Sequence, residues 1–381
     1  MIFLFENNKL INYKMKRKVF LKKLTGLTLC CVMLCSCAKK VSSNPIVVIQ
    51  PIDSTIKNNI VFKDLVTTDW KGIVWDAYNK DWNNVATIKD AQQIAAAGIQ
   101  WTRLWVTADK PNAVNDSMVI RCTNNNIKIV ACYVKSNPSN DLGDSTQQAE
   151  QVISLKNFVS RYKNTIKYYE IGNEPNLISY WNTTPGAYVS SANPGEAGRG
   201  STDPNSIYNA GVRRYVQWLH LAYNAIKQTD SSATVILGGV SSYIMSDFMD
   251  RFTIEKGYLY CDEVAYHPYA ETADLSISRL NDFKAKLTTW PAPKNNPPIW
   301  ITEIGFQNAD ENVKATQITE LMPKLIKNLS FSRPIFWYIL HDNAFGLLSQ
   351  AVSGNAVTTT FFPAYYSYQG LNQSWNYYQV N

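Results

Sequence analysis

The chain has 381 residues, of which 45% are hydrophobic, 12% aromatic and 18% charged, enough for one large domain or two modest ones. This composition excludes a disordered or fibrous protein. The formal charge is +7, but residues 1–37 carry seven basic side chains against the single acidic residue Glu6, so the rest of the chain is close to neutral. The sequence therefore has no basic stripe that would favour a nucleic-acid partner.

The N-terminal segment has the features of a secretion signal. A basic head is followed by an apolar run over residues 24–34, which is too short to span a bilayer as a permanent helix. Residues 34–37, Leu-Cys-Ser-Cys, resemble the lipobox of bacterial lipoproteins, in which the last cysteine is acylated and becomes the mature N-terminus. The resemblance implies a lipoprotein signal peptide over residues 1–37 and lipidation of Cys37. The alternative is an ordinary cleaved signal peptide.

The other cysteines and the histidines indicate neither a disulfide framework nor a metal site. Four of the seven cysteines lie in the signal, which leaves Cys122, Cys132 and Cys261, an odd number at wide spacing. Cys132 and Cys261 lie inside apolar runs and are expected to be buried thiols. The alternative, in an oxidising compartment, is a disulfide bond. The three histidines show no metal-ligand spacing. We expect no metal and no organic cofactor.

Residues 38–60 are polar and lack periodicity, which predicts a flexible tether before a folded domain over residues 61–381. Within that domain, short β-branched and aromatic runs alternate with longer helical patterns, as a parallel sheet covered by helices requires. Eight such runs predict strands: 72–76, 101–105, 127–133, 166–171, 233–238, 262–266, 298–302 and 334–339.

Helical patterns lie between these runs. They cover residues 88–97, 146–162, 206–229, 247–256, 277–289 and 313–329, and residues 363–371 would be the eighth helix. Repeated strand–helix units predict a single catalytic domain with the (β/α)8 TIM barrel fold. A doubly wound sheet would need a Gly-rich phosphate turn after its first strand, where Trp75-Asp-Ala-Tyr stands instead. The longest irregular stretch, residues 182–205, follows the fourth strand and is expected on the catalytic rim.

This strand assignment makes two glutamates candidate catalytic residues. In such a barrel, side chains at the C-terminal ends of the strands converge on one pocket. Glu174 lies just after the fourth strand and Glu303 at the end of the seventh, so both carboxylates would face one cavity. Glycosidic cleavage requires such a pair, because one group protonates the departing oxygen while the other meets the positive charge at the anomeric carbon. Either glutamate alone could equally be a helix cap or a surface residue.

The surrounding motifs carry a family resemblance. Asn173-Glu174-Pro175 and Trp300-x-Thr302-Glu303-x-Gly305 resemble the signature pair of clan A glycoside hydrolases, retaining enzymes on a (β/α)8 barrel. Within the clan, the segment from Glu170 to Asn176 is most similar to family thirty-nine, the β-xylosidase and iduronidase type. The likeness covers most of residues 61–371. It implies that Glu174 is the general acid/base, Glu303 the nucleophile, and Asn173 a hydrogen-bond donor to the sugar 2-hydroxyl.

The resemblance extends to three further polar residues. Arg103 matches the arginine of the clan that orients the nucleophile; its alternative is a buried ion pair with a structural carboxylate, and either role needs an acidic partner. His267 and Tyr269, after the sixth run, resemble the His-x-Tyr region that positions the nucleophile or the sugar. A lone histidine is also commonly a satisfied structural residue.

Two tryptophans complete the candidate substrate site. Trp337 resembles the aromatic floor of the clan under the sugar, and its alternative is core packing. Trp75 ends the first run and is a natural subsite residue, to which the resemblance assigns no role. One departure concerns the family: its xylosidases usually carry an added C-terminal β-sandwich, whereas this chain ends about ten residues after residue 371. That departure bears on the family and the xylosidase specificity, not on the clan.

These observations predict a lipid-anchored retaining β-glycosidase that hydrolyses an oligosaccharide or polysaccharide as a monomer in the bacterial cell envelope. Two other classes of protein are alternatives. A surface glycan-binding lipoprotein on an inactive barrel would keep the aromatic subsites and lose the chemistry, which the presence of both glutamates disfavours. A barrel lyase or aldolase would need a Schiff-base lysine at a strand end, whereas Lys128 and Lys167 lie near strand beginnings.

Overall fold

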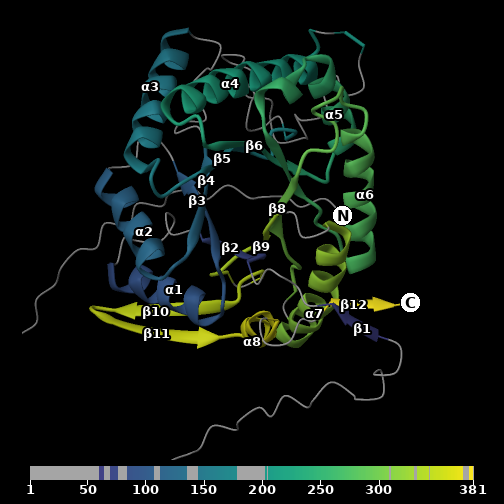
Figure 1. Ribbon diagram of the computed structural model, residues 1–381. Coiled ribbons are helices and arrows are strands. Elements are labelled where there is room, and N and C mark those ends of the chain that lie inside the picture. Colours follow the sequence, from purple (N-terminus) through teal and green to yellow (C-terminus); the bar gives the residue numbers. More distant parts are fainter. Residues whose placement is uncertain are drawn as a thin grey trace, which may run out of the picture. The chain divides into compact units, whose positions relative to one another are not determined.

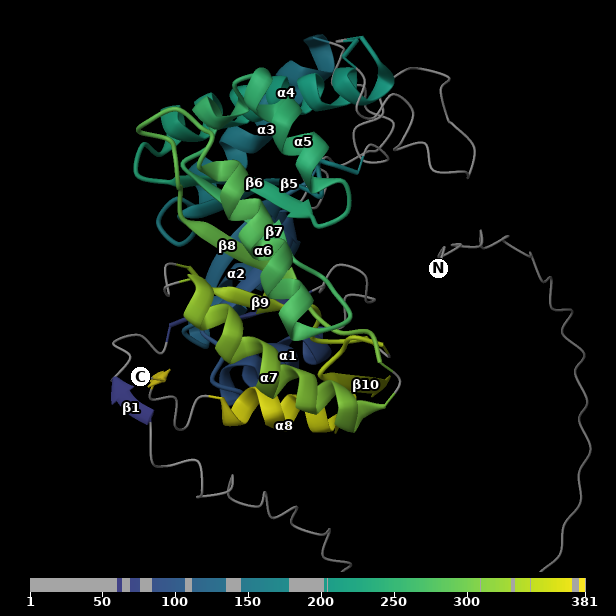
Figure 2. The same ribbon diagram turned by 90° about the vertical axis from the view of Figure 1, so that its right-hand side faces the viewer.

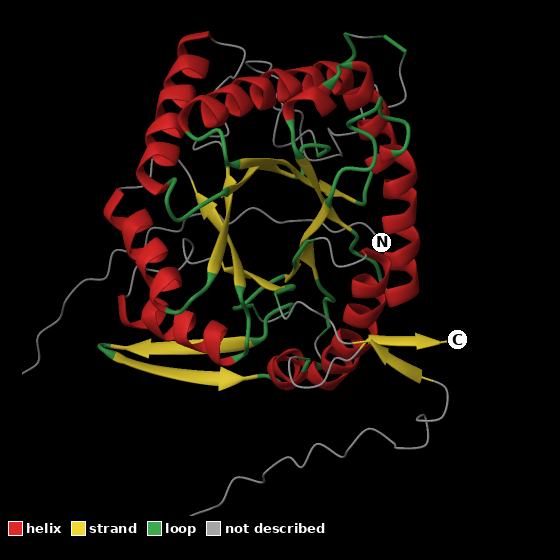
Figure 3. Cartoon of the chain, viewed as in Figure 1, coloured by secondary structure: helices red, strands yellow, loops and turns green. Residues whose placement is uncertain are grey.

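Eight parallel strands close into a barrel in the computed structural model, and helices surround them (Figures 1 and 3). Each strand pairs with the next along the chain, and the last, β9, pairs with the first, β2. The barrel strands are β2 (Lys71–Trp75), β3 (Trp101–Val106), β4 (Lys128–Tyr133), β5 (Tyr168–Asn173), β6 (Thr234–Ser241), β7 (Glu263–His267), β8 (Ile299–Ile304) and β9 (Ile335–Trp337). All eight overlap the predicted runs, so the TIM barrel prediction is confirmed.

The described part of the chain begins at residue 60, and residues 59–381 form one compact unit. The structure describes residues 60–63, 69–75, 84–106, 112–134, 145–177, 202–203, 205–308, 310–329, 333–342, 344–371 and 377–380. The predicted signal peptide with Cys37, nearly all of the predicted tether and most of the loop 182–205 lie outside these residues. No helix within the described ranges is long and apolar enough to cross a membrane.

Eight α-helices are present in the described ranges, each after a barrel strand. They are α1 (Asn84–Ala96), α2 (Asn112–Asn124), α3 (Ser145–Tyr162), α4 (Ile207–Thr229), α5 (Met245–Ile254), α6 (Ala273–Leu287), α7 (Glu311–Leu329) and α8 (Pro363–Gly370); a short 3-10 helix, η4 (Gly257–Tyr260), follows α5. Helices α6 and α7 pack side by side on the face of the barrel that Figure 2 turns to the viewer. Only α2 was not predicted from the sequence.

Two antiparallel pairs stand apart from the barrel (Figure 1). Strands β10 (Leu348–Ser353) and β11 (Ala356–Phe361) form a hairpin that packs against α1 and precedes α8. Strands β1 (Ile60–Lys63) and β12 (Tyr377–Val380) join the two ends of the compact unit. The sequence analysis predicted neither pair.

The apolar core has two layers, because strands of a closed barrel are buried on both faces. The larger layer lies between the barrel and the helices. The smaller one fills the barrel, where Trp101, Trp300 and Phe336 pack with five aliphatic residues. The rings of Trp101 and Trp300 meet edge to face, with centroids 5.6 Å apart. This packed interior lies below the strand ends that carry the candidate site.

The three described cysteines, Cys122, Cys132 and Cys261, are buried and not joined by a disulfide. The prediction that Cys132 and Cys261 are buried thiols is confirmed. Burial raises the pKa of the Cys132 thiol well above its ordinary value, so this side chain is neutral at neutral pH.

Candidate active site

Glu174 lies in a sharp turn directly after β5. Its backbone has φ +43°, a conformation uncommon outside glycine, and hydrogen bonds hold it on both sides. The Glu174 N–H donates to the carbonyl of Gly239 on β6 over 2.9 Å, and its own carbonyl accepts from Leu177 N–H over 2.8 Å. The buried side chain of Asn176 pairs with both backbone groups of Ser241, each over 2.9 Å. These hydrogen bonds therefore fix the backbone that carries the Glu174 side chain.

Glu303 lies within β8 and is almost fully buried. Its Oε1 accepts a hydrogen bond from Arg103 Nη1 over 2.5 Å, and its Oε2 accepts one from the Tyr269 hydroxyl over 3.0 Å. Burial, and then the negative charge of Glu303, raise the pKa of Tyr269 well above its ordinary value. Tyr269 therefore stays protonated and acts as a donor to the carboxylate.

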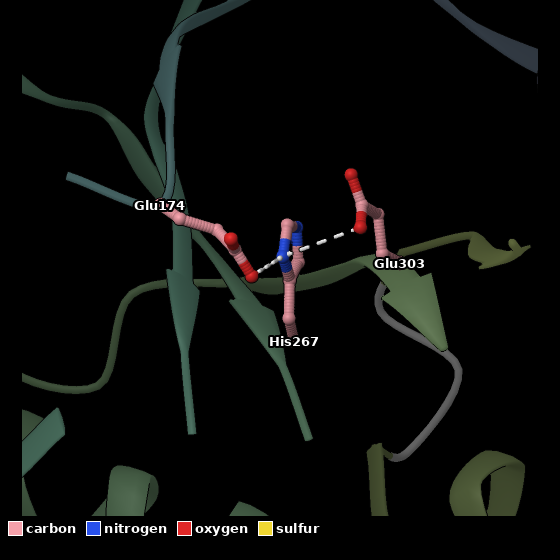
Figure 4. Close-up of side chains that lie close together, drawn as sticks. All are labelled: Glu174, His267 and Glu303. Carbon is pink, nitrogen blue, oxygen red and sulfur yellow. Dashed lines mark hydrogen bonds and ion pairs between the residues drawn. The ribbon is translucent and has the colours of Figure 1, made fainter. Parts of the chain in front are cut away.

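Glu174 and Glu303 face each other with His267 between them (Figure 4). The Nδ1 atom of His267 is 3.3 Å from Glu174 Oε1 and 3.7 Å from Glu303 Oε2. One oxygen of each carboxylate and one ring nitrogen all lie within 4.8 Å of one another. Such a trio also has the spacing of a metal site, but both oxygens of Glu303 already accept hydrogen bonds from Arg103 and Tyr269. The arrangement therefore fits acid/base and nucleophilic chemistry better than metal binding.

Arg103 on β3 is fully buried and joins two carboxylates. Besides Glu303, it contacts Glu170, with Nε 2.5 Å from Oε2 and Nη2 3.0 Å from Oε1. Arg103 thus forms a buried ion pair with Glu170 and also donates a hydrogen bond to Glu303, the candidate nucleophile. Arg103 Nη2 also donates to Asn173 Oδ1 over 2.8 Å. Because that bond occupies the amide oxygen, the Nδ2 group is the end of Asn173 that can donate to a ligand.

Trp75 and Trp337 were predicted to line the substrate site, and the structure corrects both predictions. Each is 0% exposed and packs in the layer between the barrel and the helices. The Trp75 indole N–H donates to Asp90 on α1 over 3.0 Å, and that of Trp337 donates to the carbonyl of Phe345 over 3.0 Å. Their neighbours Val74 and Phe336 are the residues that point into the barrel. The two indoles therefore point outward, because side chains alternate along a strand.

Other aromatic side chains flank the carboxylates. The Tyr269 ring lies 6.3 Å from that of Tyr338 and 6.2 Å from that of Phe345, between centroids. The Trp105 ring lies 5.4 Å from the Arg103 guanidinium. Sequence reasoning missed Tyr338, because only the structure shows that Phe336 points inward and Trp337 outward.

Six of the predicted residues come together on the strand ends. Their carboxylates, imidazole, phenol, guanidinium and amide form one contiguous cluster: Arg103, Asn173, Glu174, His267, Tyr269 and Glu303. The roles that the resemblance assigned to them stay predictions. Glu170 and Thr302 also belong to the cluster, and the sequence analysis gave neither a function.

Comparisons with known proteins agree with this picture. Residues 207–356 match the family model described as the glycosyl hydrolase catalytic core, a range that includes Glu303, His267 and Tyr269. Among the curated proteins, none matches the chain.

Solved structures share the fold at low sequence identity. A family 39 glycoside hydrolase from the gut symbiont Bacteroides cellulosilyticus superposes with a TM-score of 0.59 at 16% identity, covering 82% of this chain and 65% of that one. This chain thus spans less than two thirds of that enzyme. A beta-glycosidase gives a TM-score of 0.57 at 14% identity, with 76% and 86% covered. A beta-glucosidase from Exiguobacterium marinum gives 0.57 at 11%, with 81% and 98% covered. The solved structures thus share the barrel fold, and residues 207–356 are similar to a glycosyl hydrolase catalytic core.

Proposed function

We propose that the glycosyl hydrolase core of this chain is a retaining β-glycosidase, with Glu303 as nucleophile and Glu174 as general acid/base. The observation that carries the proposal is the spacing of the two carboxylates, whose nearest oxygens lie within 4.8 Å of each other. Retaining enzymes hold their carboxyl groups about 5–5.5 Å apart, whereas inverting enzymes need about 6.5–9.5 Å to admit a water. The pair in this barrel suits direct attack by the second carboxylate.

The proposed reaction has two displacements. In the first, Glu303 forms a bond to the anomeric carbon as the glycosidic bond breaks, and Glu174 gives its proton to the leaving oxygen. In the second, Glu174 takes a proton from water, whose oxygen bonds to the anomeric carbon while the bond to Glu303 breaks. Arg103 and Tyr269 support both steps, because they donate to the Glu303 oxygens and hold them in position. Asn173 is the proposed donor to the sugar 2-hydroxyl.

Replacing Glu174 with Ala is expected to separate the two displacements. With a 2,4-dinitrophenyl β-glycoside the leaving group departs without protonation, so the glycosyl-enzyme still forms but its hydrolysis slows, by about 10²- to 10⁴-fold. Added azide needs no general base. It should therefore raise turnover and give the β-glycosyl azide, which NMR identifies by its anomeric coupling.

The products of that experiment decide between mechanisms. An α-glycosyl azide would contradict the double displacement, and the absence of any azide effect would contradict the role of Glu174. The alternative function, an inactive glycan-binding barrel, predicts binding of oligosaccharides by the wild-type chain with no release of aryl alcohol from any β-glycoside.

We also propose that Cys37 is acylated and tethers the enzyme to a membrane of the bacterial cell envelope. The proposal rests on the basic head, the short apolar run and the lipobox-like residues 34–37. Cells that express the full chain should incorporate an alkyne-labelled fatty acid into it and retain it in the membrane fraction. Cys37→Ala should lose both, whereas Cys122→Ala should lose neither. Equal labelling of the two variants would contradict the anchor.

A further inference from the structure

A chain of buried hydrogen bonds runs from Glu170 through Thr302 and His267 to Glu174. All of its links below Glu174 are 0% exposed. Thr302 Oγ1 lies 3.0 Å from Glu170 Oε1 and 3.0 Å from His267 Nε2. His267 Nδ1 then lies 3.3 Å from Glu174 Oε1. With water excluded from these links, each hydrogen along the chain has to belong to one of its two neighbours.

The direction of this chain is set at Glu170, whose two oxygens act only as acceptors. Oε1 accepts from Gly239 N–H over 2.8 Å and from Arg103 Nη2 over 3.0 Å, and Oε2 accepts from Arg103 Nε over 2.5 Å. Guanidinium and backbone N–H groups can only donate. The single hydroxyl hydrogen of Thr302 therefore points to Glu170, and a lone pair of Thr302 faces His267.

This direction determines the tautomer of His267. Since Thr302 offers His267 an acceptor, the hydrogen of that contact is carried by Nε2. A neutral imidazole then has a bare Nδ1, which faces Glu174. Glu303 Oε2, the other oxygen near Nδ1, already accepts from Tyr269. The hydrogen bond between Nδ1 and Glu174 therefore needs one proton, which is carried either by Nδ1 or by the Glu174 carboxyl group.

Gly239 provides the room for this arrangement. A Cβ atom at that position would lie 2.1 Å from His267 Nε2 and 2.7 Å from Thr302 Oγ1, so any larger residue would break the contact between them. The same glycine donates its N–H to Glu170 and accepts the N–H of Glu174. One backbone position thus serves both ends of the chain of hydrogen bonds.

We propose that Thr302 is a positioning residue that holds His267 in the Nε2–H tautomer, and that His267 Nδ1 and Glu174 share the proton used in acid/base catalysis. The inference rests on the proposed function. The charged and titratable groups that face His267 are Glu174 from the turn after β5, Glu303 from β8 and Tyr269 after β7; Arg103 and Glu170 act from below.

The shared proton supports both displacements. In the first, it passes to the leaving oxygen, which leaves a carboxylate of Glu174 opposite the bare Nδ1 of His267. Two lone pairs then face each other across 3.3 Å in a site of low dielectric constant, which is unfavourable. This repulsion between the lone pairs ends when Glu174 takes a proton from the attacking water, whose oxygen bonds to the anomeric carbon. His267 thereby strengthens Glu174 as a base without leaving its tautomer.

The test compares Thr302→Val, which removes the hydroxyl at constant shape, with Thr302→Ser, which keeps it. The chain has only three histidines, so the nitrogen spectrum of the full chain labelled with ¹⁵N-histidine resolves each imidazole, and His267 is identified by its loss in His267→Gln. The wild-type chain and Thr302→Ser should show hydrogen on Nε2 of His267. Thr302→Val should lose that preference, because no acceptor then faces Nε2 and Nδ1–H can donate to Glu174. Hydrogen on Nδ1 with none on Nε2 in the wild type would overturn the proposal.

Kinetics provide the second measurement on the same variants. Thr302→Val should lower kcat/KM for an aryl β-glycoside by about 10-fold and shift the pH profile, and Thr302→Ser should restore both. An unchanged profile in a folded Thr302→Val would also overturn the proposal. Failure of the proposed function is distinguishable, since Glu174→Gln would then keep full activity whatever tautomer the spectrum shows.

Discussion

Glu303→Gln is expected to lose hydrolysis of aryl β-glycosides by on the order of 10⁴-fold or more while keeping its fold. The amide of glutamine cannot attack the anomeric carbon, so no glycosyl-enzyme forms. The shape of the side chain is unchanged, and its remaining oxygen can still accept from Arg103, which lies 2.5 Å away in the wild type. The measurement is kcat/KM on an aryl β-glycoside together with thermal unfolding of the same sample.

A matched control and a chemical label make this result specific. Glu150→Gln changes the charge in the same way at an exposed position of α3 and should keep wild-type turnover. A 2-deoxy-2-fluoro glycoside with a good leaving group should trap the wild-type intermediate, and the labelled peptide should carry the sugar on Glu303. Turnover retained by Glu303→Gln, or a label on another residue, would remove the nucleophile assignment.

The barrel could be predicted because its strands are buried on both faces. Runs such as residues 129–133 are therefore continuously apolar and stand out between polar segments. Helix α2 was missed because its buried stripe is narrow and begins with a polar residue, Asn115, followed by Met118, Val119 and Cys122. The hairpin β10–β11 had a usable signal, since the turn residues Gly354-Asn355 precede a run rich in β-branched residues, Ala356–Phe361.

The same double burial hid the inward face of each strand. An apolar strand has no polar alternation to indicate which side chains point into the barrel, and an error of one position reverses every assignment. Trp337 was assigned to the cavity by resemblance and Trp75 by its place at a strand end, and both point to the helices. Glu174 and Glu303 were found because a carboxylate at a strand end needs no face assignment. Glu170, a carboxylate inside a buried strand, was a signal in its own right that the sequence analysis did not use.

Arg103→Met should have the largest effect on stability, a loss of about 3–5 kcal/mol in the free energy of unfolding. Burial opposes the charge of Arg103, but attraction to the carboxylates of Glu170 and Glu303 outweighs it and raises the pKa of Arg103 above its ordinary value. The neutral Cys132 thiol contributes no charge to this attraction. Removing the guanidinium leaves the two carboxylates as close, buried like charges. Urea denaturation at neutral pH measures the loss.

The loss of stability should depend on which charges remain near position 103. Arg103→Lys keeps one positive charge but cannot reach with one nitrogen the groups that Nε, Nη1 and Nη2 contact separately. It should therefore regain part of the stability and little of the activity. Adding Glu170→Gln to Arg103→Met removes one of the two negative charges that repel each other and should also recover part of the lost stability.

These comparisons separate a charge effect from a packing effect. If Arg103 mainly filled space, adding Glu170→Gln would not improve the stability of Arg103→Met, and the double variant would lose the sum of the two single losses. If Arg103 balances charge, the double variant should be more stable than Arg103→Met alone, because only Glu303 is then a buried carboxylate without a cationic partner. An additive result would mean that Arg103 holds Glu303 by shape, and that the buried ion pair with Glu170 contributes little to folding.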